Sequence, residues 1–138
     1  MIHSPRPKLL IAEDHAAMRQ TMVALLASVA SDIKEASDGA EAVRLFAEQQ
    51  PDWVIMDIHM KPMNGLEATR QLRAEFPSAR VVMVSEDDSP ELRAQAAAAG
   101  ACEYVRKDEL AKLPGMIGRN DGMVLQKQTK ETKEIEKQ

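Results

Sequence analysis

A set of polar residues in the chain has the composition of a phosphoryl-transfer site. Each of these residues follows or ends a short apolar segment: Glu13, Asp14, Asp57, Ser85 and Lys107. Three ionised carboxylates held close together repel one another, so we expect a hard divalent cation to compensate their charge. Mg²⁺ fits best, because a metal held by one or two carboxylates and water keeps positions open for phosphoryl oxygens.

Asp57 is the predicted nucleophile of this site. A carboxylate forms an aspartyl phosphate when a metal and a lysine neutralise the transferring group. The Ser85 hydroxyl and the Lys107 ammonium could share the charge of that group. Taken alone, Asp57 would equally suit a turn at a strand end, and Glu13 and Asp14 would suit capping of the helix after them. The five positions together favour the functional interpretation.

Short apolar segments alternate with longer segments of helical period, and this alternation predicts the elements that position the site. Strands are expected at residues 8–12, 32–36, 52–56, 80–85 and 102–106. The pattern predicts an α/β fold, a (βα)5 doubly wound parallel five-stranded sheet. For such a sheet we expect the flavodoxin-like strand order 2-1-3-4-5. Ligands of open α/β sheets gather outside the carboxyl ends of the strands, where all of the polar residues above stand.

Local signals predict several helix ends. Asp38, followed three residues later by Glu41, is typical of a capping box at the start of a helix. Ser89 before Pro90 predicts an N-cap with proline at the first helical position. Gly100 can end that alanine-rich helix in a left-handed cap.

The C-terminal part of the chain departs from the regular pattern. A fifth helix should open at Asp108 and stop or kink near Leu113, because Pro114 inside a helix costs about 3 kcal/mol. We assign residues 1–117 to one globular domain and residues 118–138 to a polar tail that is disordered or marginally helical. The tail is too short and too polar for a helix-turn-helix domain, so we expect no DNA-binding output from this chain.

Composition excludes several classes of function. The 138 residues include 22 acidic and 18 basic ones, and the net charge of −4 disfavours nucleic-acid binding. A single cysteine excludes an internal disulfide, and no apolar segment approaches the roughly 18 residues of a membrane span. We therefore expect a cytoplasmic protein that does not bind membranes. His15 and His59 do not stand at the spacing of zinc ligands, so no zinc site is predicted.

Residues 7 to 113 resemble the receiver domain of two-component response regulators. The resemblance depends on four motifs: "AED" (12–14), "MDIHMKPMNG" (56–65), "MVSE" (83–86) and "GACEYVRKDEL" (100–110). The "KDEL" block and "GLEATRQLR" (65–73) are similar to the NarL-type subgroup, whose receivers usually precede a helix-turn-helix DNA-binding domain. On this resemblance, residues 1–117 form the receiver domain.

The resemblance implies a role for each site residue. It makes Asp57 the phosphoacceptor, and it implies that Mg²⁺ is held by Glu13, Asp14, Asp57 and the main-chain carbonyl of His59. Lys107 matches the phosphate-binding lysine, and Ser85 and Tyr104 match the pair that switches conformation. The implied partner is a sensor histidine kinase or a phosphotransfer protein. The fourth helix, fifth strand and fifth helix are the expected face for partner binding or for a homodimer.

Two positions depart from the family pattern and keep other functions open. Lys61 stands where the family usually has proline, which here follows as Pro62, and Glu86 stands where the family prefers a small residue. Glu86 adds negative charge beside an incoming phosphoryl group, so phosphorylation is expected to be slow or short-lived. One alternative is a metal-dependent hydrolase of the aspartyl-phosphate type, but its usual second acid is replaced by His59. The other is a receiver-like scaffold that is not phosphorylated.

Overall fold

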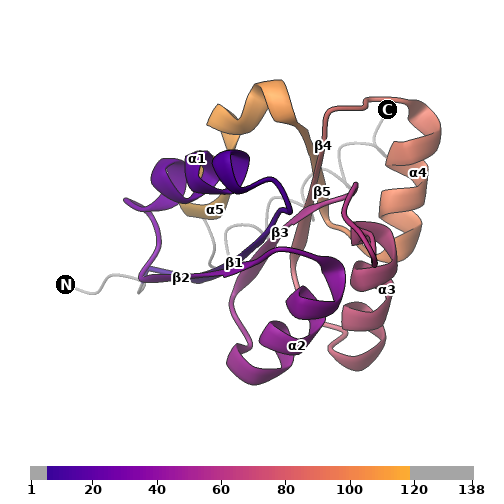
Figure 1. Ribbon diagram of the computed structural model, residues 1–138, viewed down its shortest axis with the longest axis horizontal. Helices are drawn as coiled ribbons and strands as arrows, with labels where there is room; N and C mark the ends of the chain where they lie inside the picture. Colours follow the sequence, from indigo (N-terminus) through magenta and orange to yellow (C-terminus); the bar gives the residue numbers. More distant parts are fainter. Residues whose placement is uncertain (1–5, 119–138) are drawn as a thin grey trace, which may run out of the picture.

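One parallel sheet of five strands forms the centre of the fold in the computed structural model, which describes residues 6–118 (Figure 1). The strand order is β2-β1-β3-β4-β5, so the predicted order is confirmed. The strands are β1 (Lys8–Ala12), β2 (Asp32–Ala36), β3 (Trp53–Asp57), β4 (Val81–Ser85) and β5 (Glu103–Arg106). The third strand ends one residue later than predicted, because Asp57 still pairs with Val84 in the sheet.

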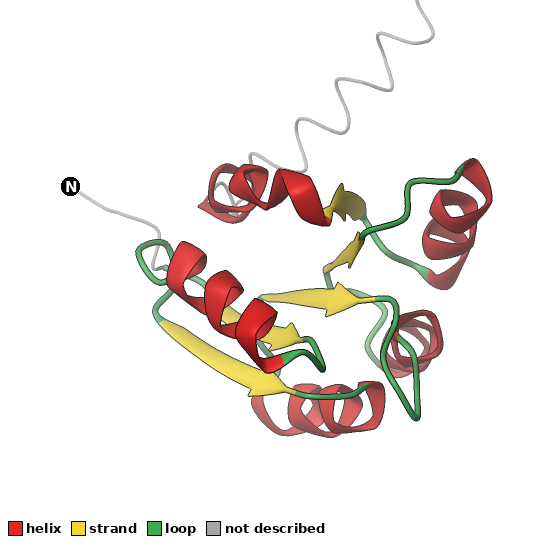
Figure 2. Cartoon of the chain, turned by 45° about the horizontal axis from the view of Figure 1, so that its top comes forward, coloured by secondary structure: helices red, strands yellow, loops and turns green. Residues whose placement is uncertain are grey.

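Helices cover both faces of the sheet, as Figure 2 shows in red. They are α1 (Ala16–Leu26), α2 (Gly39–Gln49), α3 (Gly65–Glu75), α4 (Pro90–Ala99) and α5 (Leu113–Gly118), with a 3-10 helix η1 (Lys107–Lys112) before α5. One core lies between the sheet and α2, α3 and α4, and a second lies between the sheet and α1, η1 and α5. Strands β3 and β4 are buried along their whole length, as expected for strands covered on both faces.

The predicted helix caps are present. The Asp38 carboxylate accepts a hydrogen bond from the main-chain N–H of Glu41, at 2.9 Å. The Glu41 carboxylate reaches back to the N–H of Ser37 rather than to that of Asp38, so the capping box is one residue wider than the standard form. Ser89 caps α4 through a 3.1 Å bond from the N–H of Leu92, and Gly100 ends α4 with a φ of +110°.

The C-terminal helix differs from the prediction. The kink lies at Glu109 rather than near Leu113, where the backbone stays helical (φ −59°, ψ −45°) and the 3-10 helix passes directly into α5. Glu109, with a φ of −122°, interrupts the 3-10 segment. Pro114 falls in the first turn of α5, where its missing N–H would have no intrahelical partner anyway. Apart from Gly118, the predicted polar tail lies outside the described residues.

The described part of the chain contains no helix that is both long enough and apolar enough to cross a lipid bilayer.

Candidate active site

Three carboxylates meet at the carboxyl end of the sheet. Glu13 and Asp14 follow β1, and Asp57 is the last residue of β3, the neighbouring strand. Each offers one carboxylate oxygen within 4.8 Å of the others. Glu13 and Asp57 are only 1% exposed, whereas Asp14 is exposed. The arrangement follows from the parallel sheet, in which the carboxyl ends of adjacent strands lie side by side.

Lys107 supplies the positive charge at this cluster. As the first residue of η1, it places its Nζ 2.9 Å from Glu13 Oε1 and 3.2 Å from Asp57 Oδ1. The other oxygen of Glu13 accepts a hydrogen bond from the N–H of His15, at 3.1 Å. Glu13 Oε1 and Asp57 Oδ1 are fully buried, and among residues 6–118 the Lys107 ammonium is the partner that both of these oxygens share. One ammonium thus compensates two buried carboxylates incompletely.

The pKa values of the paired groups reflect this imbalance. Burial and the charge of Glu13 raise the pKa of Asp57 to about 6, against the opposing effect of Lys107. Burial lowers the pKa of Lys107, but Glu13 and Asp57 outweigh that effect and leave the pKa above its ordinary value. The site therefore holds excess negative charge. Carboxylate oxygens are the ligands that Mg²⁺ takes in proteins, and three of them lie within 4.8 Å of one another, so the residues present fit that metal.

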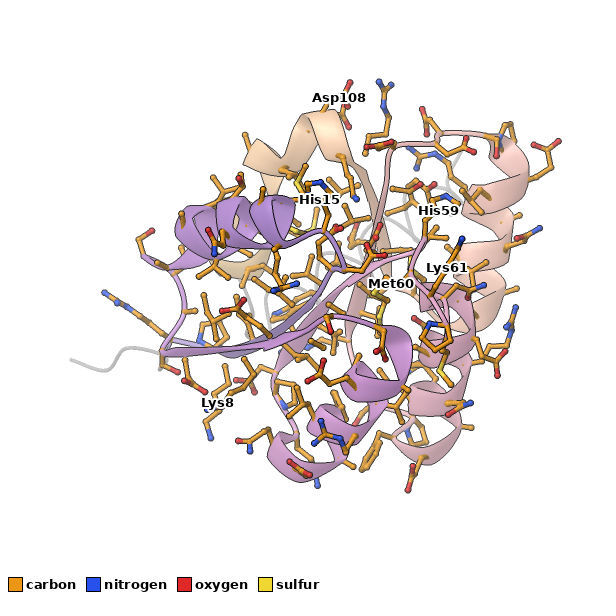
Figure 3. All side chains as sticks on the ribbon, viewed as in Figure 1. Lys8, His15, His59, Met60, Lys61 and Asp108 are labelled. Carbon is orange, nitrogen blue, oxygen red and sulfur yellow. The ribbon has the colours of Figure 1, made fainter. Side chains whose placement is uncertain are left out.

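An open pocket lies over the carboxylates, and its rim comes from three different segments. Besides the carboxylates and Lys107, it is lined by His15, Met18, His59 and Glu86. Figure 3 labels His15 and His59 at the carboxyl end of the sheet and Lys8 at the opposite end. The structure thus brings His59, whose main-chain carbonyl is a predicted metal ligand, and Glu86 to the pocket.

The loop after Asp57 is tightly packed. The carbonyl of Ile58 accepts hydrogen bonds from the N–H groups of Met60 and Gly65. A Cβ atom on Gly65 would lie 2.1 Å from the carbonyl oxygen of Asp57, so no other residue fits there without moving the backbone. Lys61 is exposed, and the peptide bond between Lys61 and Pro62 is cis. The Lys-Pro departure therefore lies on the outside of the loop.

The predicted switch residues are joined through a third residue. Ser85 is fully buried at the end of β4, and its Oγ accepts a hydrogen bond from the N–H of Asp87, at 3.0 Å. Tyr104 on β5 donates its hydroxyl hydrogen to the carbonyl of Asp87, at 2.6 Å. The guanidinium of Arg93 lies 4.5 Å from the centre of the Tyr104 ring. Burial raises the pKa of the Tyr104 hydroxyl.

Sequence reasoning missed two residues that shape the site. Asp87 links Ser85 to Tyr104 through its main chain, and Arg19 holds the carbonyl of Glu13. A main-chain contact leaves no trace in residue type, so the role of Asp87 could not be found from the sequence. The weak signal for Arg19 is its place one turn into α1, close to the predicted acidic pair. The predicted capping of α1 by Glu13 and Asp14 is also changed, since the N-cap is His15.

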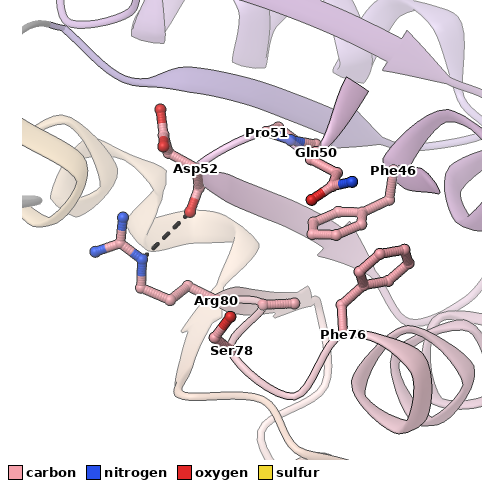
Figure 4. Close-up of a pocket in the computed structure, with 8 residues that line it drawn as sticks. Phe46, Gln50, Pro51, Asp52, Phe76, Ser78 and Arg80 are labelled. Atoms are coloured by element: carbon pink, nitrogen blue, oxygen red, sulfur yellow. Dashed lines mark hydrogen bonds between the residues drawn. The ribbon is translucent and has the colours of Figure 1, made fainter. Parts of the chain in front are cut away.

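A second pocket lies at the other end of the sheet, among the C-terminal ends of α2 and α3 (Figure 4). The rings of Phe46 and Phe76 form part of its wall, with 5.0 Å between their centroids. Arg80 Nε donates to the carbonyl of Asp52 at 3.2 Å, and the Arg80 guanidinium lies 4.4 Å from the centre of the Trp53 ring. These contacts are those of packing between loops, and the pocket is remote from the carboxylates.

Comparisons with known proteins agree with this geometry. A family model described as "Response regulator receiver domain" matches residues 9–118. The transcriptional regulatory protein LiaR of Bacillus subtilis is 34% identical over 107 residues, which are 75% of this chain and 50% of LiaR. The transcriptional activator protein ExaE of Pseudomonas putida is 36% identical over 101 residues, 72% of this chain and 47% of ExaE. The chain thus spans about half the length of these relatives.

Solved structures show the same architecture. The NarL signal receiver domain of Mycobacterium tuberculosis superposes with a TM-score of 0.77 at 26% identity, covering 86% of this chain and 100% of that one. The CheX-CheY-BeF3-Mg complex of Borrelia burgdorferi contains a chain that superposes with a TM-score of 0.73 at 26% identity, covering 77% and 82% of the two chains.

Proposed function

Because the chain belongs to the receiver domains of two-component response regulators, we propose that it accepts a phosphoryl group on Asp57 in a Mg²⁺-dependent reaction. The observation that carries the proposal is the convergence of Asp57, two further carboxylates and Lys107 in one pocket. The excess negative charge of this cluster supports a metal, and the ammonium supports an anionic substrate.

The proposed reaction transfers the phosphoryl group from a phosphohistidine to Asp57. An ionised Asp57 oxygen attacks phosphorus, the P–N bond to the imidazole breaks, and the imidazole leaves with a proton from solvent. When bound by Glu13, Asp14, Asp57 and the carbonyl of His59, Mg²⁺ would supply positive charge that the crowded carboxylates and the phosphoryl oxygens share. The donor is a sensor histidine kinase or a phosphotransfer protein.

Lys107 and Ser85 would stabilise the transferred group. Lys107 already lies 3.2 Å from Asp57, so a small movement of its flexible stem lets the ammonium contact a phosphoryl oxygen. The Ser85 hydroxyl can donate to another of these oxygens. Because the same Oγ accepts from the N–H of Asp87, turning it inward disturbs the loop that also holds Tyr104. This movement is the proposed signal, and the chemistry is confined to the protein's own phosphorylation and dephosphorylation.

The output surface that we propose is the face formed by α4, β5 and the segment after β5. It would bind a protein partner or a second copy of the chain, and the net charge of −4 does not favour nucleic acid as a partner. Glu86 lines the pocket and adds negative charge beside Asp57, which supports slow uptake or a short-lived adduct.

Intact-protein mass spectrometry after incubation with acetyl phosphate and Mg²⁺ tests the proposal. We expect one phosphoryl adduct on the wild type, none on Asp57→Asn, and a normal adduct on Asp32→Asn, which alters an exposed aspartate at the start of β2. Repeated turnover of added phosphomonoesters would instead indicate the hydrolase alternative. A protein that takes up no phosphoryl group with Mg²⁺ present would be a receiver-like scaffold.

A further inference from the structure

Arg19 connects helix α1 to the two strands beneath it. It lies one turn into α1, and its side chain is 19% exposed. Its Nη1 donates a 2.7 Å hydrogen bond to the main-chain carbonyl of Glu13, and its Nε lies 2.9 Å from Oε1 of Glu35 on β2. A charged, largely buried side chain thus contacts the backbone at the point where the acidic pair begins.

The contact controls the peptide unit between the two acidic residues. The carbonyl of Glu13 and the N–H of Asp14 belong to one planar group, so a bond to that carbonyl sets the direction of both residues. The N–H of Glu13 is also fixed, because it donates to the carbonyl of Ala36 at 3.0 Å. Arg19 therefore adds a restraint on the carbonyl of Glu13 to those at the N–H of Glu13 and at its carboxylate, which accepts from the N–H of His15.

The hydrogen bond to the carbonyl matters more than the ion pair with Glu35. Hydrogen bonds from a charged donor are stronger than neutral ones, and this one is short and partly buried. The Glu35 side chain is 46% exposed, and ion pairs with such a partner contribute little stability in water. Glu35 mainly orients the guanidinium.

We propose that Arg19 is a positioning residue for the acidic metal site: it holds the Glu13–Asp14 peptide in the orientation that Mg²⁺ binding requires. It acts through these two residues and touches neither the metal nor the phosphoryl group. The inference depends on the metal site of the proposed function. Residues that orient metal ligands typically contribute about 10-fold to 100-fold to metal affinity.

A Mg²⁺ titration of the full chain tests the inference. Backbone amide chemical shifts at residues 12–15 report binding, and thermal unfolding measures the stability of each variant. We expect Arg19→Ala to weaken Mg²⁺ affinity about tenfold or more while lowering the metal-free melting temperature only slightly. Arg19→Lys should recover part of the affinity, because an ammonium can also donate to a carbonyl. The Mg²⁺ affinity of Glu35→Gln should stay within about twofold of the wild type, since Arg19 keeps its hydrogen bond to the carbonyl of Glu13 in this variant.

Arg70→Ala is the matched control for charge. Arg70 lies on α3 in an exposed pair with Glu67, so this variant also removes one positive charge but leaves the site untouched. Equal Mg²⁺ affinity in Arg19→Ala and the wild type would overturn the role of Arg19. An equal loss in Arg70→Ala would overturn it too, since it would show a general charge effect. If Arg19→Ala does not fold, the other two variants decide. Wild-type affinity in Arg19→Lys together with a tenfold loss in Glu35→Gln would contradict the proposal, because the ion pair with Glu35 and not the bond to Glu13 would then support the metal site. A wild type that does not respond to Mg²⁺ would refute the proposed metal site itself.

Discussion

The ammonium of Lys107 lies 3.2 Å from the carboxylate of Asp57, although the two residues stand at the ends of strands that are not neighbours. Asp57 ends β3, Lys107 follows β5, and β4 lies between them. The long lysine side chain crosses the end of β4 and also reaches Glu13, beyond β3 on the other side, at 2.9 Å. A single flexible cation is therefore the main charge compensation that the described residues give to two buried carboxylates.

Lys107→Met should destabilise the metal-free protein at neutral pH. The substitution keeps most of the aliphatic stem but leaves Glu13 and Asp57 buried without a cation, which costs about 3 kcal/mol. Chemical denaturation at pH 7.5 measures the loss, and added Mg²⁺ should recover part of it. Lys112→Met is the control, because Lys112 is exposed and pairs with the exposed Glu109 at the surface. Equal stability of the two variants would contradict the central role given to Lys107.

Asp57→Asn should stabilise the metal-free protein at neutral pH but not in acid. The pKa of Asp57 is raised from 3.8 to about 6 in the folded state, so folding favours the protonated form. The wild type therefore loses stability as the pH rises from about 4 to about 7, by at most roughly 3 kcal/mol. The amide cannot ionise and avoids that loss, so the advantage of the variant should vanish below about pH 4.

Unfolding experiments in EDTA across this pH range would measure the difference between Asp57→Asn and the wild type. Asp32→Asn serves as the control, because Asp32 is exposed and pairs only loosely with Lys34, at 3.7 Å. A difference that stays constant with pH would show that Asp57 does not titrate as proposed.

Gly65→Ala should damage the loop that carries the acceptor. The new Cβ would lie 2.1 Å from the carbonyl oxygen of Asp57 and 3.0 Å from Cα of Ile58, and backbone atoms cannot turn aside as a side chain can. We expect a loss of about 3 kcal/mol in unfolding free energy, together with slower phosphoryl uptake.

Gly115→Ala is the matched control for this substitution. Apart from its chain neighbours and the backbone of α5 itself, no atom of the described residues lies within 4 Å of the Cβ position of Gly115, which stands inside α5. The alanine should leave stability unchanged or raise it by up to about 1 kcal/mol through helix propensity. If both variants had the same free energy of unfolding in urea denaturation, the close approach at Gly65 would not limit which residue fits there.

Ser85→Ala should permit phosphorylation but weaken the conformational response. The substitution removes the hydroxyl that accepts from Asp87, so a phosphoryl group on Asp57 loses its connection with the loop that holds Tyr104. Amide hydrogen exchange with and without beryllofluoride would measure protection over residues 85–113. We expect a change in the wild type and little change in Ser85→Ala. Tyr104→Phe, which removes only the hydroxyl from the ring, should respond to an intermediate degree. Identical protection in both states of the wild type would refute the switch.

The sequence alone determined the five parallel strands, their alternation with helices and the edge at which the polar residues gather. The reason is that short buried strands and periodic helices produce patterns along the chain, and parallel strands place their carboxyl ends together. The caps at Asp38, Ser89 and Gly100 were predictable for a similar reason, because capping depends on neighbouring residues.

Tertiary structure alone decided which groups meet within that edge. The pairing of Lys107 with Glu13 and the bond from Tyr104 to Asp87 join segments far apart in the sequence. The bond from Arg19 to Glu13 spans only six residues, but its acceptor is a main-chain carbonyl, which residue type does not reveal. Tertiary structure also decided that the helix continues past Leu113, since Leu113 and Ile117 are fully buried in the core shared with α1. Local propensity predicted a stop or kink near Leu113, but burial of these apolar side chains favours a further helical turn that the proline can begin.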